Sequence, residues 1–378
     1  MDLGFLRRLY DDIGEYVSVY LDTDRVHEGN NSEATQIRWQ DARRELVAAG
    51  ADETSLDAVA ELVADRDEVA AGRAMFARNG AVVFTGAMDA PPRREIARYA
   101  SLPHLMPLLA QHRPPIPHVR VSGTRTGGEV VAIGGSGDAW RDWMSGRQWP
   151  VHKVKVGGWA QDKLQRRAEE TWEENAKELA AEVVAAADRV GARHVIISGD
   201  VRVRSMLLEH LSGQLRESAA LVDKEVSADS SAMAEAADHA LSEWADRDRR
   251  ARFEDWGAYL AHDQAVQGLT QTLTALRNGQ ASDVFIADNP HSIATAWIGP
   301  GGADVAATSE ELQVRGVSEP VSDRADAAIV RAIATTEAEL HFLPEDLLVG
   351  GDPAARGGVA RPFDGIGATL RFPHLITA

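Results

Sequence analysis

The chain contains no cysteine among its 378 residues. Disulfide bonds, thiol catalysis and cysteine-ligated zinc are therefore excluded, and nothing indicates an oxidising compartment. No apolar run approaches the roughly 18 to 20 residues that a membrane-spanning helix needs. The first residues also lack the basic-then-apolar order of a signal peptide. These absences predict a cytoplasmic protein that has no membrane partner.

Familiar catalytic signatures are missing as well. There is no Gly-x-Ser-x-Gly elbow and no His-Glu-x-x-His, and the glycines of 134–137 lack a following Gly-Lys-Ser/Thr. His104, His112 and His118 lie among prolines, with no carboxylate or cysteine at metal-ligand spacing, so they are more simply surface residues. The sequence therefore predicts no metal site and no cofactor.

Ser198-Gly199-Asp200 follows an apolar segment typical of a buried strand. Ligands of α/β sheets bind at such strand ends. A small-molecule enzyme using this turn is one hypothesis, and a plain strand-to-helix turn is the simpler interpretation.

Charge is distributed unevenly along the chain. The formal net charge is −18, which argues against a general nucleic-acid coat protein and against a DNA partner. Residues 141–167 nevertheless hold seven Lys or Arg against two Asp, a local net charge of +5. One local contact with a phosphate-rich partner is therefore compatible with the acidic net charge of the whole chain.

Alternating helical and strand patterns predict a mixed α/β protein of three domains, with boundaries at 1–115, 116–225 and 226–378. The middle domain is expected to be a mixed sheet with helices. Asn79-Gly80 between two apolar runs predicts a hairpin, and Gly127-Gly128 predicts a second one. Helices are expected over 161–189, 204–211, 227–261, 266–276 and 322–336, and strands over 16–21, 194–198, 284–287, 340–342 and 366–372.

The basic segment contains the candidate binding residues. Lys153 and Lys155 alternate with valines, and Gly157-Gly158 allow close approach of the backbone to another molecule. Gln161 stands where the long helix is expected to begin, and unpaired backbone N–H groups at a helix start can meet an anion. The remaining candidates are basic residues and a tryptophan that can stack on bases: Arg147, His152, Trp159, Lys163, Arg166 and Arg167. The simpler interpretation of the basic segment is a solvated surface loop in which charges happen to cluster.

The order of three blocks, the basic loop and the Gly-Gly segment before a long helix resemble the archaeal and eukaryotic class-one release factors. Pelota shares that architecture but not the Gly-Gly motif. The similarity is greater to their bacterial relatives, which include hibernation factors and proteins grouped with the quality-control peptidyl-tRNA hydrolase. It is carried by Pro150–Lys153, Gly157-Gly158-Trp159, the helix from Gln161, Val195–Gly199 and Asp364–Ala368.

The resemblance implies a C-terminal domain that is an α/β/α sandwich like a small ribosomal protein. It also implies binding to the vacant ribosomal A site, with contacts to ribosomal RNA and P-site tRNA, and delivery by a translational GTPase. Gly157, Gly158 and Gln161 would then be catalytic in peptidyl-tRNA hydrolysis, with Gln161 orienting water. Here two residues separate Gly158 from Gln161, and the stop-codon-reading Asn-Ile-Lys-Ser is absent. Non-catalytic ribosome hibernation under stress is the alternative.

Overall fold

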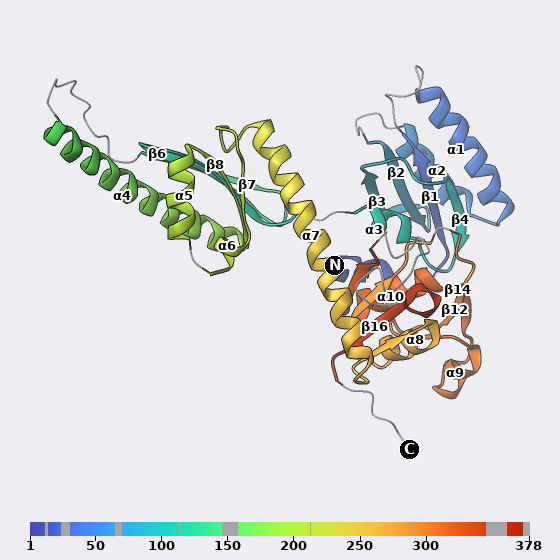
Figure 1. Ribbon diagram of the computed structural model, residues 1–378. Helices are drawn as coiled ribbons and strands as arrows, with labels where there is room; N and C mark the ends of the chain where they lie inside the picture. Colours follow the sequence, from blue (N-terminus) through green and yellow to red (C-terminus); the bar gives the residue numbers. More distant parts are fainter. Residues whose placement is uncertain are drawn as a thin grey trace. The chain divides into compact units, whose positions relative to one another are not determined.

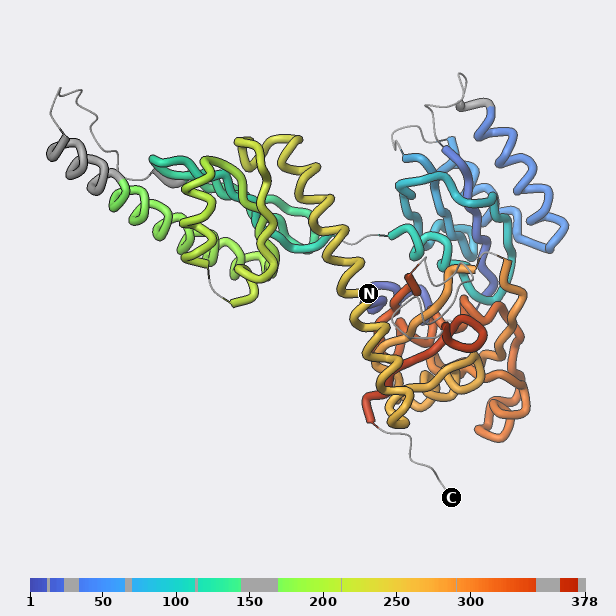
Figure 2. The backbone as a smooth tube through the Cα atoms, in the orientation of Figure 1, coloured from blue at the N-terminus to red at the C-terminus, as the bar shows by residue number. Residues whose placement is uncertain are grey.

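The protein is described from a computed structural model (Figures 1 and 2). The structure describes residues 1–11, 14–23, 31–64, 70–112, 115–145, 158–211, 213–289, 291–344 and 361–372, with all their side chains except those of 31–33, 144–145 and 158–168. The chain forms two compact units, Met1–His112 with Asp248–Ala378, and Arg113–Arg247. The three-domain division stays a prediction beside these two units.

The N-terminal part of the first unit is an antiparallel sheet. Its strands, in spatial order, are β3 (Ala81–Met88), β2 (Gly72–Arg78), β1 (Tyr16–Asp22) and β4 (Ile96–Ala100). Asn79 and Gly80 connect β2 to β3 with φ angles of 50° and 78°, as a two-residue hairpin turn with left-handed residues requires. The predicted Asn-Gly hairpin is confirmed.

Strand β1 is buried on both faces because alternate side chains enter different cores. On one face, Val17, Val19 and Leu21 pack in a core with helices α1 (Asn31–Ala48) and α2 (Glu53–Ala64). On the other face, Tyr20 joins a larger core that contains residues from both ends of the chain. This second face therefore needs a cover that α1 and α2 do not supply.

The C-terminal part of the same unit supplies that cover with two further sheets. One has the order β10 (Ala265–Gln267), β16 (Ile366–Leu370), β11 (Ala281–Ile286) and β15 (Glu339–Phe342). The other has the order β13 (Val305–Ala306), β12 (Thr295–Ile298) and β14 (Val321–Arg324). The remaining elements are α3 (Met106–Gln111), α8 (Leu269–Arg277), α9 (Ser309–Val314), α10 (Ala325–Thr336), η1 (Gly4–Tyr10) and η3 (Phe363–Gly365).

Polar contacts also tie the two parts of this unit together. The carboxylate of Asp323 on β14 pairs with Arg98 on β4 and accepts the Leu102 N–H at 2.9 Å. Its side chain is 1% exposed, so both partners are needed to offset the loss of hydration. Near this carboxylate, the buried His104 ring lies 3.8 Å from Asp326 of α10.

The second unit contains a mixed five-stranded sheet. Its order is β7 (Ala139–Ser145), β6 (Gly127–Ile133), β5 (His118–Thr124), β8 (His194–Gly199) and β9 (Ala219–Leu221), with β8 parallel to both neighbours. The helices are α4 (Gly158–Val190), α5 (Val201–His210), α6 (Gly213–Glu217) and α7 (Ser231–Leu260), of which α7 continues into the first unit at Asp248.

Alternation along β8 separates the two faces of this sheet. Val195 and Ile197 enter a core with α4 and α5, while Ile196 packs against Met233 and Ala237 of α7. The sheet is thus covered by helices on both faces, which explains the continuous apolar sequence of β8.

The predicted fold class is confirmed, since helices and several sheets alternate along the chain. Some element predictions were wrong. Val266 lies in β10 before α8, and residues 322–324 belong to β14 before α10, because short strands at sheet edges interrupt an apparently helical pattern. The second hairpin turns at Arg125-Thr126, and the glycines lie in β6.

Two of the three histidines expected at the surface are buried. His104 and His118 are 3% and 7% exposed, because His104 lies between the buried residues Leu102 and Leu105, and His118 begins β5, an inner strand of its sheet. His112 is exposed, as expected. Among the described residues, no helix combines the length and apolarity needed to cross a membrane.

His104 gives the first prediction. Burial lowers the pKa of His104 from 6.5 to about 4, so the unfolded chain binds a proton there at a higher pH than the folded chain does. Stability from this group is full above pH 6.5 and is lost as the pH falls toward 4. Between pH 7.5 and 5 the loss is about 2 kcal/mol.

Urea unfolding at both pH values tests this. His104→Gln should flatten the pH dependence by about that amount, whereas His112→Gln, at the exposed histidine, should leave it unchanged. Equal pH dependence in the wild type and His104→Gln would contradict the assignment.

Candidate nucleic-acid interface

The predicted site residues lie at and before the start of α4. Gly158 is its first residue, and Trp159, Gln161, Lys163, Arg166 and Arg167 follow within it; their side chains are outside the described set. Arg147, His152, Lys153, Lys155 and Gly157 lie outside the described residues. The expected helix from Gln161 to Arg189 is therefore confirmed with slightly wider bounds, and the site roles stay predictions.

Helix α4 is held to its sheet some distance from these residues. It has 33 residues, which corresponds to about 50 Å at 1.5 Å per residue. Its first buried apolar residue among those described is Ala176, about 27 Å along the axis from Gly158. From Ala176 onward, Leu179, Ala180 and Val183 pack on the sheet.

Glycines in the sheet allow α4 to approach closely. A Cβ at Gly128 of β6 would lie 2.6 Å from Cδ2 of Leu179, and one at Gly123 of β5 would lie 2.8 Å from Val203 of α5. The sequence predicts Gly128 as a turn residue, but in the structure it allows α4 to pack closely on the sheet. A larger residue at this position would push α4 off the sheet.

Polar contacts fix α4 just before its apolar stretch. The Arg125 guanidinium lies 4.6 Å from the centroid of the Trp172 ring, and Asn175 donates to the Arg125 carbonyl at 3.0 Å. His210 of α5 lies 2.7 Å from Glu173. The sequence did not reveal these contacts, because the turn, α4 and α5 are far apart in the chain.

Gly199 and Asp200 of the expected turn line a cleft of about 400 Å³ at the carboxyl ends of β5 and β8. Asp200 caps α5 by accepting the Arg202 N–H at 2.9 Å, and it pairs with Arg125 at 3.0 Å. Burial would raise the pKa of Asp200, but the Arg202 N–H and the charge of Arg125 outweigh burial and lower it. Asp200 is thus held as an anion in a structural role.

Ser198 is fully buried and hydrogen-bonded. Its hydroxyl lies 2.8 Å and 3.0 Å from the carbonyl oxygens of Lys224 and Val226, and it accepts the Val226 N–H at 2.9 Å. A hydroxyl with these partners is not available to a substrate. The turn therefore orders the chain between β9 and α7.

Strand β7 contains the first residues of the basic segment and exposes an aromatic ring. Trp143 is 63% exposed, and Arg141 on the same face of the strand pairs with Asp229 at 2.9 Å. Trp140 points to the opposite face, where Arg189 of α4 lies 3.9 Å from its ring centroid. The strand thus combines a ring held by α4 with a ring open to a partner.

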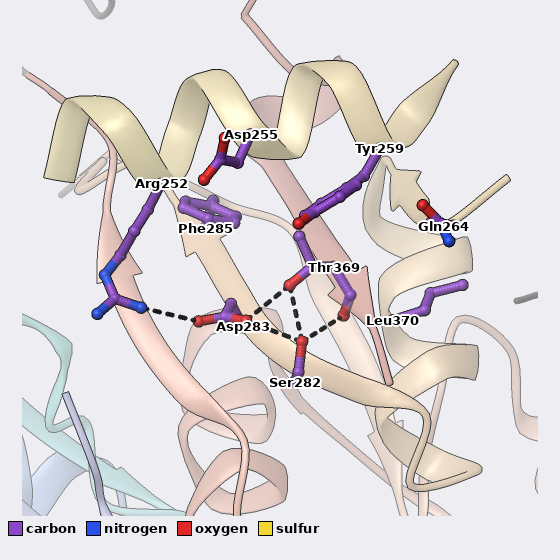
Figure 3. A pocket seen from close by; sticks show the side chains of 9 residues that line it. All are labelled: Arg252, Asp255, Tyr259, Gln264, Ser282, Asp283, Phe285, Thr369 and Leu370. Atoms are coloured by element: carbon purple, nitrogen blue, oxygen red, sulfur yellow. Dashed lines mark hydrogen bonds and ion pairs between the residues drawn. The ribbon is translucent and has the colours of Figure 1, made fainter. Parts of the chain in front are cut away.

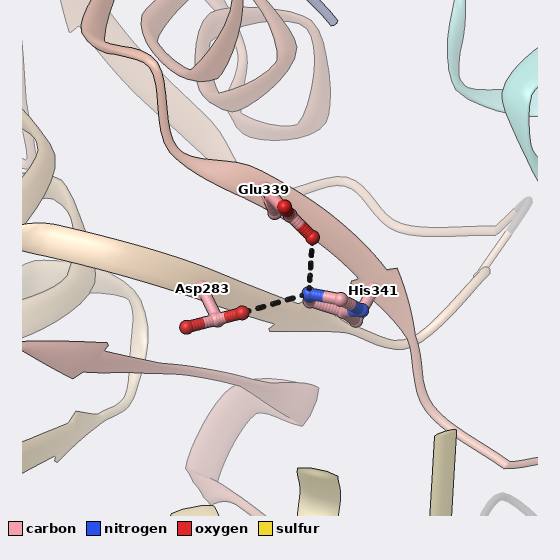
Figure 4. A group of neighbouring side chains, drawn as sticks. All are labelled: Asp283, Glu339 and His341. Carbon is pink, nitrogen blue, oxygen red and sulfur yellow. Dashed lines mark hydrogen bonds and ion pairs between the residues drawn. The ribbon is translucent and has the colours of Figure 1, made fainter. Parts of the chain in front are cut away.

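The first unit contains a polar cavity of about 410 Å³ (Figure 3). Its lining residues come from the end of α7 and from the sheet around β11: Arg252, Asp255, Tyr259, Gln264, Ser282, Asp283, Phe285, Thr369 and Leu370. Beside it, Asp283, Glu339 and His341 bring three possible metal-ligand atoms within 4.8 Å of one another (Figure 4). The sequence analysis missed this group.

Comparison with known proteins bears on the part of the chain that contains the basic segment and α4. Residues 117–262 match the family model of the bacterial archaeo-eukaryotic release factor family 2. The chain is 27% identical to the uncharacterized protein Rv2629 of Mycobacterium tuberculosis (strain ATCC 25618 / H37Rv), over 97% of this chain and 96% of that one. The resemblance predicted from the sequence is confirmed: the chain is similar to bacterial relatives of the archaeal and eukaryotic release factors.

Solved structures give weaker similarities. Archaeal translation termination factor aRF1 is 14% identical, covers 98% of this chain and 99% of its own, and has a TM-score of 0.26. Archaeoglobus fulgidus Pelota is 14% identical, covers 80% and 79%, and has a TM-score of 0.34. At these TM-scores the whole molecules do not superpose closely, and we infer nothing from their arrangement.

Gly199 gives the second prediction. Its φ is 112°, and a Cβ there would overlap the Gly123 carbonyl oxygen. Gly199→Ala should therefore lower the free energy of unfolding by about 3 kcal/mol or more, from strain and overlap together.

Gly191→Ala is the matched control in a urea titration. Gly191 has a φ of 67° and open space around its Cα, so the variant carries the backbone strain alone. It should cost about 1 kcal/mol. Equal costs at the two glycines would show that the close approach of β5 and β8 is unimportant.

Proposed function

We propose that the protein binds the vacant A site of the ribosome and brings the segment around Gly157–Gln161 to the peptidyl-transferase centre. The observation that supports this most is the family match over residues 117–262, which covers the basic segment and all of α4. The role implies a cytoplasmic protein, and the resemblance adds a translational GTPase as a proposed partner.

Charge and anchoring support an RNA contact. The net charge of +5 over residues 141–167 stands against −18 for the whole chain, so this segment suits a phosphate backbone far better than the chain as a whole does. Exposed Trp143 lies near the start of this segment, and an exposed ring can stack on a base. Packing of Leu179 and Val183 gives α4 a fixed base from which its first residues extend.

The proposed chemistry is hydrolysis of the peptidyl-tRNA ester. Gln161 would orient the attacking water, and Gly157 and Gly158 would leave room for the tRNA end. Stabilisation of a developing oxyanion by positioned dipoles requires no protein general base. Ribosomal groups would supply the remaining contacts.

Ribosome hibernation without chemistry is the second candidate. The observation that favours it is that α4 already begins at Gly158, so Gly158, Trp159 and Gln161 share one helical turn. Helical backbone restricts how Gln161 can reach a reacting ester. In this role the segment would occupy the site and release nothing.

Peptide release separates the two roles. If the protein is a hydrolase, ribosomes carrying peptidyl-tRNA should lose peptide, and Gln161→Ala should slow release by about 100-fold or more. Gln165→Ala, four residues further along α4, is the matched control and should retain the wild-type rate. Release at equal rates by wild type and Gln161→Ala would exclude a catalytic Gln161, and absence of release with retained binding would support hibernation.

Ribosome binding has its own test. Affinity measured by co-sedimentation should fall steeply with salt, and Lys153→Glu with Lys155→Glu should weaken binding and reduce the salt slope by about one to two. The control changes two exposed lysines elsewhere in the same unit, Lys177→Glu with Lys224→Glu, and alters the net charge equally. Equal weakening by both pairs would mean that net charge, and no local contact, governs binding.

A further inference from the structure

Two neighbouring strands of the first unit place three metal-ligating side chains on one face of a sheet. Strands β11 and β15 are parallel, and their register pairs Asp283 with Glu339 and Phe285 with His341. Residues two apart on a strand point to the same face, so Glu339 and His341 lie beside Asp283. Chain positions far apart in sequence thus converge through the register alone.

The distances between the three groups suit a shared cation (Figure 4). Nε2 of His341 lies 3.0 Å from Oδ1 of Asp283 and 3.5 Å from Oε2 of Glu339. Ligands bound to one tetrahedral zinc ion at 2.0 to 2.1 Å are themselves about 3.3 Å apart. All three ligand atoms lie within 4.8 Å of one another, so small side-chain rotations would bring them to these spacings.

Surrounding groups orient the ligands. The other carboxylate oxygen of Asp283, Oδ2, accepts hydrogen bonds from the hydroxyls of Thr369 at 2.7 Å and Ser282 at 2.8 Å (Figure 3). The Phe285 ring stacks on the His341 ring at a centroid distance of 5.3 Å. Such outer contacts fix ligand geometry at metal sites.

Cations already near the group lie at the outer limit of ion pairing. The Arg252 guanidinium is 3.8 Å from Asp283 but only 2.8 Å from Asp248, and the Met1 amino group is 3.7 Å from Glu339. Each carboxylate thus has one cationic partner at this longer distance, Arg252 for Asp283 and the Met1 amino group for Glu339. A divalent ion would compete with Arg252 for this negative charge.

We propose that Asp283, Glu339 and His341 bind one divalent transition-metal ion, of which Zn²⁺ best suits an imidazole with two carboxylates. Three protein ligands leave a coordination position for water. The ion joins β15, a four-residue edge strand, to β11 and so stabilises the sheet. The site is independent of the ribosomal role proposed above.

Zinc titration of the metal-free protein by calorimetry tests the proposal, with Mg²⁺ titrated in parallel. We expect one saturable site per chain for Zn²⁺ at micromolar concentration, a higher melting temperature on binding, and weaker binding of Mg²⁺, which prefers oxygen ligands. His341→Gln should weaken the site by about 100-fold or more, and Thr369→Val, which removes only an outer hydroxyl, by about tenfold.

Two further variants keep the test decisive. Glu339→Gln changes a half-exposed side chain, so the variant should fold and still lose the site. Arg252→Gln removes the competing charge and should tighten Zn²⁺ binding by roughly threefold to tenfold, the opposite sign from every ligand variant.

The matched control is His210→Gln, which removes a histidine that contacts a single carboxylate, Glu173, in the other unit. It should leave the titration unchanged. Absence of a saturable site, or a site that His341→Gln and Glu339→Gln leave intact, would overturn the proposal and assign the group to ion pairing alone.

Discussion

Helix α10 is buried around almost its whole circumference, and the first unit is organised by that constraint. Every residue from Ala327 to Ala334 is buried, including Arg331, whose guanidinium donates to the carbonyl oxygens of Gly299, Pro300 and Gly301. A helix without a solvent face must be covered from all sides. Its cover comes from η1 and α3, which belong to residues 1–112, and from α8 and β12, which belong to residues 248–378. These two parts of the chain therefore share one core.

Dependence on contacts between distant residues also explains which parts of the fold could be predicted from the sequence and which could not. Local signals gave the Asn79-Gly80 hairpin and the long helix after Gly158, because turn chemistry and helical periodicity are properties of a short stretch. The short edge strands β10 and β14 were read as parts of helices, since only pairing with distant strands defines them. The burial of His104 likewise depends on Asp323 and Asp326, more than 200 positions away.

The candidate sites also divide into those with a local signal in the sequence and those created by contacts between distant residues. The basic segment is visible in the sequence because its charge contrasts with the rest of the chain, and its resemblance is carried by contiguous motifs. The contacts that fix α4, such as Arg125 on Trp172, join separate elements and have no signature in the chain. The group of Asp283, Glu339 and His341 is created by the register of two parallel strands and could not be predicted before the strands were paired.

The shared core also sets an order of folding during synthesis. The apolar face of the first sheet that carries Tyr20 and Phe76 is covered only in part by η1 and α3 until residues up to Ala368 have been made. At roughly 5 to 20 residues per second, the intervening stretch of about 250 residues takes on the order of 12 to 50 s to translate. Residues 113–247 have their own core and can fold within that interval. The nascent N-terminal sheet therefore keeps part of an apolar face exposed to water until the C-terminal part of its unit has been made.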